Sequence, residues 1–360
     1  MPSSEILESV VPRSIIIGES ILEKIPSVVK NLRIPPKVVI FTGPKTRKIA
    51  GEEVYDILTS KGIDSELILV EDSSLESAIA VKDQCFPYNP NVLIGVGGGK
   101  VIDVTKFCLL GGSKKQEMIS VPTSTPHDGI ASPYIFLKNP TETYIGECRP
   151  PIAVIADIKK ILQHPNLTRY LTAGIGDTVG KITAIWDWRH AWRIKSERFS
   201  RFVGGVLENS ESLLRNQVSE ALKDLNHAIQ VVLKALLIAG VLMGTSNDIR
   251  VGYGSEHMFS AALDAEIPNS NILHGERIAL GSIMIARLQG QDDYRIKELL
   301  ENAGCPTSID DLEEEIPPEA IVQALTKAHK VNSMYTILGT TGLTESAASN
   351  LARNTGVIKA

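Results

Sequence analysis

Residues 92–103 read VLIGVGGGKVID, and this stretch decides the fold of the first half of the chain. The apolar run Val92–Val96 is followed by three glycines, Gly97–Gly99, and then by a helical pattern that extends to about Leu110. An apolar strand, a glycine turn and a helix in this order predict one unit of a parallel sheet, because the strands of such sheets are covered by helices on both faces.

Similar units lie on either side of this stretch. We predict further strands at Ser14–Ile17, Lys37–Phe41, Leu67–Val70 and Met118–Val121. Their alternation with helical segments predicts a Rossmann-like, mainly parallel sheet of the α/β class. A hairpin around the turn Lys138–Pro140 and one return strand are expected next, at Tyr134–Leu137, Glu142–Ile145 and Ile152–Ile155.

From Lys159 onward the strand patterns stop and amphipathic helix patterns take over. We expect helices at Gly180–Lys195, Val218–Met243, Glu256–Leu263, Glu276–Leu288, Tyr294–Ala303, Glu319–Lys330 and Glu345–Asn354. A chain of 360 residues is too long for one ordinary core. We therefore predict a dinucleotide-binding α/β domain at residues 1–158 and an all-helical, metal-binding and catalytic domain at residues 159–360.

The composition excludes several classes of protein. The formal net charge of −5 carries no basic excess, which argues against nucleic acid as a partner. The N-terminus has no basic segment before its apolar run, and no stretch reaches about 18 uninterrupted apolar residues, so we expect neither a signal peptide nor a membrane span. Four scattered cysteines argue against a zinc knuckle or a disulfide scaffold and favour a reducing cytoplasm: Cys85, Cys108, Cys148 and Cys305.

The glycine run is the best candidate for a phosphate site. Backbone N–H groups of consecutive glycines can approach a pyrophosphate closely, and the N-terminus of the following helix adds a partial positive charge. The run is neither GxGxxG nor the P-loop GxxxxGK[ST], and three glycines alone would indicate only a tight turn. Its position between a strand and a helix favours the phosphate site.

A second segment, residues 122–129, reads PTSTPHDG and follows the next predicted strand. Open α/β sheets bind ligands at the carboxyl ends of their strands, so hydroxyl groups here suit a cofactor. Asp128 could accept a hydrogen bond from a substrate hydroxyl. The alternative is a Thr/Ser/Pro turn in which Asp128 caps the following residues, and spacing alone favours that turn.

Metal-ligand residue types gather in the helical half. Asp177 is expected at the start of a helix, and His257 and His274 lie further along the chain. One carboxylate and two imidazoles leave a coordination position open for substrate, which is typical of a catalytic metal site. They are too scattered for HExxH, and a single histidine is more often structural, the interpretation given to the other five: His127, His164, His190, His227 and His329. His127 could equally relay a proton to the substrate oxygen.

Six segments occur in the order typical of one enzyme family: GGGKVIDVTK, PTSTPHDGIAS, AGIGDTVGK with a following DW, GSEHMFSAALD, HGERIALG and YTILGTTGL. Over nearly its whole length the chain resembles the glycerol-1-phosphate dehydrogenases. These belong to the superfamily of glycerol dehydrogenases, iron-dependent alcohol dehydrogenases and dehydroquinate synthases. GGGK and the Asp-His-His set mark the superfamily, whereas HDGIAS, DW and SEHxFS point to the narrower family.

The resemblance implies roles for individual residues. Asp177, His257 and His274 would hold one zinc ion per chain, and Asp128 and Asp177 would contact the substrate. NADPH or NADH would be bound by Gly97, Gly98, Gly99, Lys100, Val101, Asp103, Thr123, Ser124, Thr125, Pro126 and Ser132. The implied reaction is the reversible reduction of dihydroxyacetone phosphate to sn-glycerol 1-phosphate for archaeal ether phospholipids, by a cytoplasmic homo-oligomer.

One position departs from the family pattern. Related sequences often read SEHxFSHALD, with a second histidine that is thought to reach the substrate, whereas this chain has Ala261 there. Residues four apart share a helix face, so Ala261 is expected beside His257 in the substrate site. Water could replace the imidazole, or the substrate preference could differ. Glycerol dehydrogenase and other polyol or phospho-sugar chemistry of the superfamily are the alternatives, as is a non-catalytic nucleotide-binding protein.

The end of the second strand bears on the choice of cofactor. NAD-selective enzymes usually carry Asp or Glu there to bind the ribose 2′-hydroxyl, but residues 42–47 read TGPKTR and contain no acid. Thr42 can donate a hydrogen bond to either ribose form, and Lys45 or Arg47 could pair with a 2′-phosphate. A solvated basic turn explains the two cations equally well. We predict that both NADPH and NADH work, with NADPH at least as good.

Overall fold

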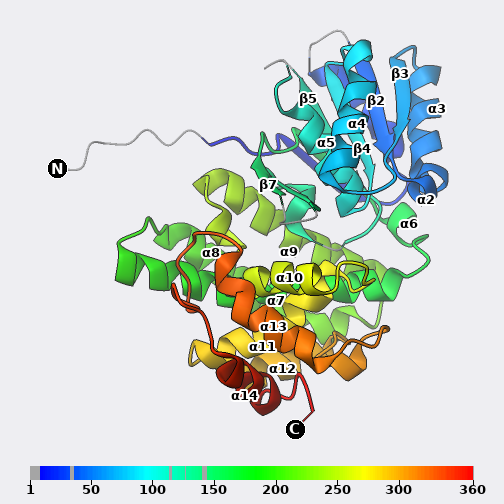
Figure 1. Cartoon of the computed structure of the whole chain (residues 1–360). Helices are drawn as coiled ribbons and strands as arrows, with labels where there is room; N and C mark the ends of the chain where they lie inside the picture. The colour runs from blue at the N-terminus through cyan, green and yellow to red at the C-terminus, as the bar shows by residue number, and fades with distance from the viewer. Residues whose placement is uncertain (1–8, 33–35, 113–115, 126, 140–143, 360) are drawn as a thin grey trace.

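The computed structural model describes residues 9–32, 36–112, 116–125, 127–139 and 144–359. A strand-rich N-terminal part is stacked on a helical C-terminal part (Figure 1). Six strands form a parallel sheet in the order β1-β8-β5-β4-β2-β3. Their bounds are β1 (Ser14–Gly18), β2 (Lys37–Thr42), β3 (Asp64–Leu69), β4 (Val92–Gly97), β5 (Glu117–Pro122) and β8 (Ala153–Asp157).

Helices cover both faces of this sheet, which confirms the predicted α/β class. Helices α1 (Ile25–Asn31) and α3 (Glu52–Ser60) share one apolar cluster with the strands. Helices α4 (Leu75–Cys85) and α5 (Gly99–Leu109) share another cluster with the strands. Strand β3 starts at Asp64, earlier than predicted, because its first residues alternate between exposed and buried at the sheet edge and so lack a continuous apolar run.

The predicted hairpin is present as a separate antiparallel pair. Strand β6 (Tyr134–Leu137) pairs with β7 (Tyr144–Glu147). The prediction placed the second strand at Glu142–Ile145, and its first two residues lie outside the described residues. After β2, a short helix α2 (Pro44–Thr46) and a π-helical turn (Arg47–Gly51) lead into α3, and neither was predicted.

The remainder of the chain is helical, as predicted. Its helices are α6 (Ile158–Ile161), α7 (Leu167–Lys195), α8 (Arg201–Ala221), α9 (Leu225–Ser246), α10 (Ser255–Glu266), α11 (His274–Leu288), α12 (Asp293–Asn302), α13 (Pro318–Lys327) and α14 (Glu345–Asn354). Helix α8 was missed, and the single helix predicted at Val218–Met243 is wrong. The chain breaks between α8 and α9, where the Asp224 side chain accepts a hydrogen bond from the Asn226 N–H and caps α9.

The start of α7 corrects a second prediction. The helix begins at Leu167, so Asp177 lies in its middle and not at its start. The glycines before Asp177 suggested a break, but they serve close packing. A methyl group on Gly174 would lie 2.0 Å from the Thr125 carbonyl oxygen, and one on Gly176 would lie 2.3 Å from the Gly275 carbonyl oxygen. Helix α7 therefore touches both the loop after β5 and the start of α11.

The sheet half and the helical half share one apolar core. Ile102, Met118 and Val154 from the first half pack in one cluster with Ile175 and Leu233 from the second. The domain boundary at residue 158 stays a prediction, although β8 ends and α6 begins there. Helix α9 is long and apolar enough to cross a membrane, but 67% of its most apolar window is buried inside the protein, as in a core helix.

Candidate active site and metal centre

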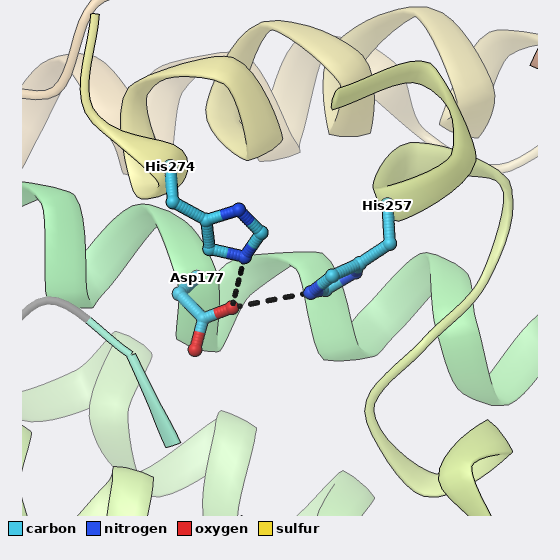
Figure 2. Close-up of side chains that lie close together, drawn as sticks. All are labelled: Asp177, His257 and His274. Atoms are coloured by element: carbon cyan, nitrogen blue, oxygen red, sulfur yellow. Dashed lines mark ion pairs between the residues drawn. The ribbon is translucent and has the colours of Figure 1, made fainter. Parts of the chain in front are cut away.

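Asp177, His257 and His274 converge from three helices (Figure 2). Oδ1 of Asp177 lies 3.4 Å from Nε2 of His257 and 3.7 Å from Nε2 of His274. One ligand atom from each residue lies within 4.8 Å of the others. The carboxylate comes from the middle of α7, and the imidazoles come from the first turns of α10 and α11. The geometry and the donor types fit a divalent metal ion with an open position for substrate.

The protonation states of Asp177 and His274 suit metal binding. Burial alone would raise the pKa of Asp177, but the Lys181 ammonium and His257 outweigh it and hold that pKa well below its usual range. Desolvation by the surrounding protein and repulsion from His257 lower the pKa of His274 well below its usual value. Asp177 is therefore ionised and His274 is neutral near pH 7, and both states are required of ligands.

A buried carboxylate orients one of the imidazoles. Nδ1 of His257 lies 2.7 Å from Oε1 of Glu256, which is fully buried. Glu256 also accepts hydrogen bonds from the Gly254 N–H at 2.9 Å and from the Thr183 hydroxyl at 2.7 Å. A donor on Nδ1 leaves the Nε2 lone pair for a metal, the usual arrangement for histidine ligands. The sequence analysis did not identify Glu256, although an acid directly before a candidate metal ligand could have indicated a supporting role.

The second imidazole has a different neighbour. Nδ1 of His274 lies 3.5 Å from the Ser260 hydroxyl, which also accepts a hydrogen bond from Nε of Arg277 at 3.3 Å. The side chain of His274 is 36% exposed, whereas that of His257 is 6% exposed. His274 therefore forms the open side of the metal site.

Asp128 is joined to the metal-ligand carboxylate through a buried lysine. Nζ of Lys181 lies 2.8 Å from Oδ2 of Asp128 and 3.0 Å from Oδ1 of Asp177. Burial would lower the pKa of Lys181, but the two carboxylates raise it well above its usual range. The Asp128 N–H also donates to Oδ2 of Asp177 at 3.3 Å. Sequence reasoning missed Lys181, although its i,i+4 spacing from Asp177 was a usable signal.

Helix α9 fixes the backbone that carries Asp128. The short 3-10 turn η4 (Asp128–Ile130) lies against α9, and a methyl group on Gly240 would lie 2.9 Å from the Asp128 carbonyl oxygen. Asp128 thus belongs to the sheet half but is held by the helical half. The structure brings Asp128 to the Asp-His-His set, as the substrate role requires, although the role itself stays a prediction.

A further buried carboxylate supports the first turn of α10. Asp187 on α7 accepts hydrogen bonds from the Ser255 N–H at 2.8 Å and from the Ile337 N–H at 2.8 Å. Burial and, secondly, the Glu256 carboxylate raise the pKa of Asp187 to about 7. Asp187 is the acid of the DW pair, so three segments that looked distinctive in the sequence meet at one side chain.

The glycine run lies at the carboxyl edge of the sheet, as predicted. Gly97 pairs with Pro122 of β5, and Thr42 at the end of β2 pairs with Val96. A methyl group on Gly97 would meet Val101 at 2.6 Å, and one on Gly98 would meet the Ser124 hydroxyl at 3.0 Å. The turn therefore favours glycine at both positions, which fits a close approach of its backbone to a pyrophosphate.

Buried hydroxyl groups line the same edge. Thr123, Thr125 and Ser132 are nearly inaccessible, and within the described part of the chain their hydroxyl oxygens have no hydrogen-bond partner. Buried polar groups are normally paired, so these hydroxyls fit a site that a polar cofactor completes. Pro126, the remaining predicted residue of this loop, lies outside the described residues.

Other predicted cofactor residues are placed less directly. Lys100 is exposed, and Val101 is buried in the apolar cluster under α5. The Asp103 carboxylate is buried and lies 3.3 Å from the Lys106 ammonium.

At the end of β2, the Thr42 hydroxyl is buried and lies 2.9 Å from the Thr46 hydroxyl, so it already has a partner. Their contacts with a cofactor stay predictions, as does the role of half-buried Ala261 one turn after His257.

Comparisons with known proteins agree with this geometry. The sequence pattern of the iron-containing alcohol dehydrogenase family matches residues 16–165. Among solved structures, a probable glycerol dehydrogenase from Sinorhizobium meliloti 1021 superposes with a TM-score of 0.78 at 16% identity, covering 98% of each chain. Glycerol dehydrogenase from Schizosaccharomyces pombe gives a TM-score of 0.79 at 17% identity, covering 98% of this chain and 91% of that one. At these identities the likeness shows the fold.

Other relatives share a much higher sequence identity with the chain. The chain is 38% identical to glycerol-1-phosphate dehydrogenase (NAD(P)+) of Staphylothermus marinus, covering 99% of this chain and all of the relative. It is also 38% identical to the enzyme of that name from Pyrococcus abyssi, covering 96% of this chain and 98% of the relative.

A parallel sheet with a glycine turn at its carboxyl edge and an Asp-His-His set on helices fits a nicotinamide-dependent dehydrogenase, and residues 16–165 match the iron-containing alcohol dehydrogenase family. Within this class, the chain belongs to the glycerol-1-phosphate dehydrogenase family. The family resemblance inferred from the sequence motifs is thereby confirmed.

Proposed function

We propose that this protein reduces dihydroxyacetone phosphate reversibly to sn-glycerol 1-phosphate, with NADPH or NADH as hydride donor and zinc as the metal. The observation that carries the proposal is the convergence of Asp177, His257 and His274 beside Asp128, which lies on the loop that follows the cofactor edge of the sheet. Family membership supplies the substrate class.

Each side chain has a defined task in this proposal. Asp177, His257 and His274 would hold the zinc ion, which stabilises negative charge on the substrate oxygen while the nicotinamide supplies hydride. Glu256 keeps His257 oriented, and the Lys181 ammonium lies 2.8 Å from Oδ2 of Asp128 and holds that side chain in place. The Asp128 carboxylate can then accept a hydrogen bond from a substrate hydroxyl and orient the carbonyl carbon toward the cofactor.

The protein's setting belongs to the same proposal. We expect a cytoplasmic enzyme that supplies the glycerophosphate backbone of archaeal ether phospholipids, and we expect it to act as a homo-oligomer. Its other ligand is a small phosphorylated molecule and not nucleic acid, in keeping with a net charge of −5.

Steady-state assays of the zinc-loaded protein test the proposal. NADPH should be oxidised when dihydroxyacetone phosphate is added, and chiral analysis should identify sn-glycerol 1-phosphate as the product. Faster turnover of glycerol or dihydroxyacetone would favour a glycerol dehydrogenase. This alternative is raised by Ala261, which stands where related sequences often have a histidine. Zinc binding without turnover of any of these substrates would indicate a non-catalytic nucleotide-binding protein.

The role of Asp128 has its own test. Asp128→Ala should reduce kcat/KM for dihydroxyacetone phosphate much more than it weakens NADPH binding, because its carboxylate lies on the metal side of the loop. Equal losses for substrate and cofactor, or no loss in either, would contradict a substrate contact.

A further inference from the structure

His127 lies between the two parts of the site. Its ring is held against the first residue of α5, since a methyl group placed on Gly99 would meet Nε2 of His127 at 1.7 Å. On the metal side, its ring centroid lies 6.2 Å from that of His274. His127 therefore stands where the glycine run and the metal pocket adjoin, a position that a single histidine in a Ser/Thr/Pro loop did not reveal.

The backbone selects one tautomer of this imidazole. The Gly129 N–H donates a hydrogen bond to Nδ1 of His127 at 2.9 Å. A proton on Nδ1 would oppose that N–H, so this hydrogen bond places the ring hydrogen on Nε2. Among the described residues, Nε2 has no hydrogen-bond partner. The loop thus presents an N–H donor, on a fixed ring, to the N-terminus of α5.

The N-terminus of α5 offers backbone donors of its own. The first backbone N–H groups of a helix lack partners within the helix and attract anions. A methyl group on Gly97 would clash with Val101, and one on Gly98 would crowd the Ser124 hydroxyl, so this turn favours glycine. A diphosphate bound here would meet the helix N–H groups on one side and the Nε2–H of His127 on the side nearer the metal.

We propose that the Nε2–H of His127 donates a hydrogen bond to the diphosphate of the nicotinamide cofactor and so directs the nicotinamide end toward the metal pocket. This inference rests on the proposed function for the identity of the cofactor. It assigns His127 to cofactor binding, and not to proton transfer or to packing alone. NADPH and NADH share the diphosphate, so the effect of this donor should be the same for both.

Matched substitutions separate the donor from the shape of the side chain. His127→Leu keeps the approximate size of the side chain but removes the donor. His127→Gln places an amide N–H close to the position of Nε2. Dissociation constants of the zinc-loaded proteins should be measured by calorimetry for NADPH, NADH, ADP and AMP. Zinc content checks that the neighbouring His274 still holds its metal.

We expect His127→Leu to weaken NADPH, NADH and ADP by about tenfold each, the size of one hydrogen bond to a charged group. AMP, which lacks the diphosphate, should bind unchanged, and His127→Gln should restore most of the loss. Unchanged ADP binding in His127→Leu, or an equal loss for AMP, would overturn the inference. A loss confined to kcat would also overturn it and would place His127 at the reacting carbonyl.

The proposed function fails differently. If wild-type protein binds NADPH but does not turn over dihydroxyacetone phosphate, the substrate assignment is wrong while the His127 comparison can still be made. If wild-type protein binds neither NADPH nor NADH, both the proposed function and this inference are wrong.

Discussion

The metal pocket and the cofactor edge are built on opposite principles. In the pocket, the proposed function would depend on almost wholly buried polar side chains with fixed partners, since Lys181 pairs with Asp177 and Glu256 pairs with His257. At the cofactor edge it would depend on backbone and small side chains, since a methyl group on Gly97 would clash with Val101. Ligands bound in the metal pocket would contact charged side chains, whereas ligands bound at the cofactor edge would contact backbone N–H groups and hydroxyls.

This difference predicts how each region responds to substitution. Removal of one member of a buried charge network leaves another charge unpaired, which is costly in a medium that hydrates it poorly. Removal of one hydroxyl at the cofactor edge leaves the backbone N–H groups in place and costs about as much as one hydrogen bond. Substitutions in the pocket should therefore have the larger effects, and the following tests are ordered from the largest expected effect to the smallest.

Loss of a metal ligand should have the largest effect on activity. His274→Ala removes one of three protein ligands, and we expect zinc content and turnover to fall by far more than the 10- to 100-fold typical of changes behind the ligands. Most of the fold should remain, because the His274 side chain is 36% exposed. Metal analysis and steady-state assays check this, and a chelator should reproduce the loss in the wild type. Full zinc and full turnover in His274→Ala would show that the metal assignment is wrong.

Removal of Lys181 should have the largest effect on stability. Lys181→Met leaves the carboxylates of Asp128 and Asp177 facing each other without their shared cation. Breaking a buried pair in this way costs about 3–5 kcal/mol of unfolding free energy. Urea unfolding of the metal-free protein measures it.

The double variant Lys181→Met/Asp128→Asn is the matched control for that measurement. It removes one of the two opposing charges, so it should recover a large share of the lost stability. Equal stabilities for the single and double variants would mean that Asp128 is not the group that Lys181 compensates.

Glu256→Gln should act on the metal more than on the fold. The amide nearly matches the carboxylate in shape, but it orients the His257 ring less firmly. It also makes Nε2 of His257 a less basic metal ligand. We expect zinc affinity to fall about 10- to 100-fold. Competition with a chelator of known affinity measures this loss. Glu298→Gln, a change on the exposed face of α12, is the control and should leave the affinity unchanged.

Much of this comparison was accessible from the sequence, and the reasons are physical. Buried parallel strands such as β2 and β4 are continuous apolar runs, and the glycine turn needs no distant contact to be recognised. The metal ligands were recognisable by residue type and family motif. Their convergence was not, because Asp177 and His274 are brought together by packing between α7 and α11.

The misses share one cause, since tertiary contacts overrode local signals. Gly174 and Gly176 indicated a helix break before Asp177, whereas the structure uses them for close contacts with Thr125 and Gly275 inside one helix. Lys181 and Glu256 were given no role from the sequence, because only their burial and pairing in the fold show what they contact. Helix α8, whose sequence is polar on average, was also missed.

The choice between NADPH and NADH should show the smallest effect, because it depends on exposed groups at the cofactor edge. No acid follows β2, and the Thr42 hydroxyl is already bonded to Thr46 at 2.9 Å. Of the two nearby cations, Arg47 is paired with Glu52 at 2.9 Å, whereas Lys45 is exposed on α2. We expect both cofactors to work, with NADPH at least as good, since no carboxylate opposes the 2′-phosphate.

Lys45→Ala should then weaken NADPH by about two- to fivefold and leave NADH unchanged, as suits an exposed ion pair that salt screens. Arg47→Ala is the control, because the Arg47 guanidinium already pairs with the Glu52 carboxylate. Michaelis constants for both cofactors at low and high salt measure these changes, and the NADPH advantage should shrink at high salt. A strong preference of the wild type for NADH would show that a residue away from the end of β2 discriminates between the cofactors. In that case, the cofactor edge would depend on a specific side chain after all, as the metal pocket does.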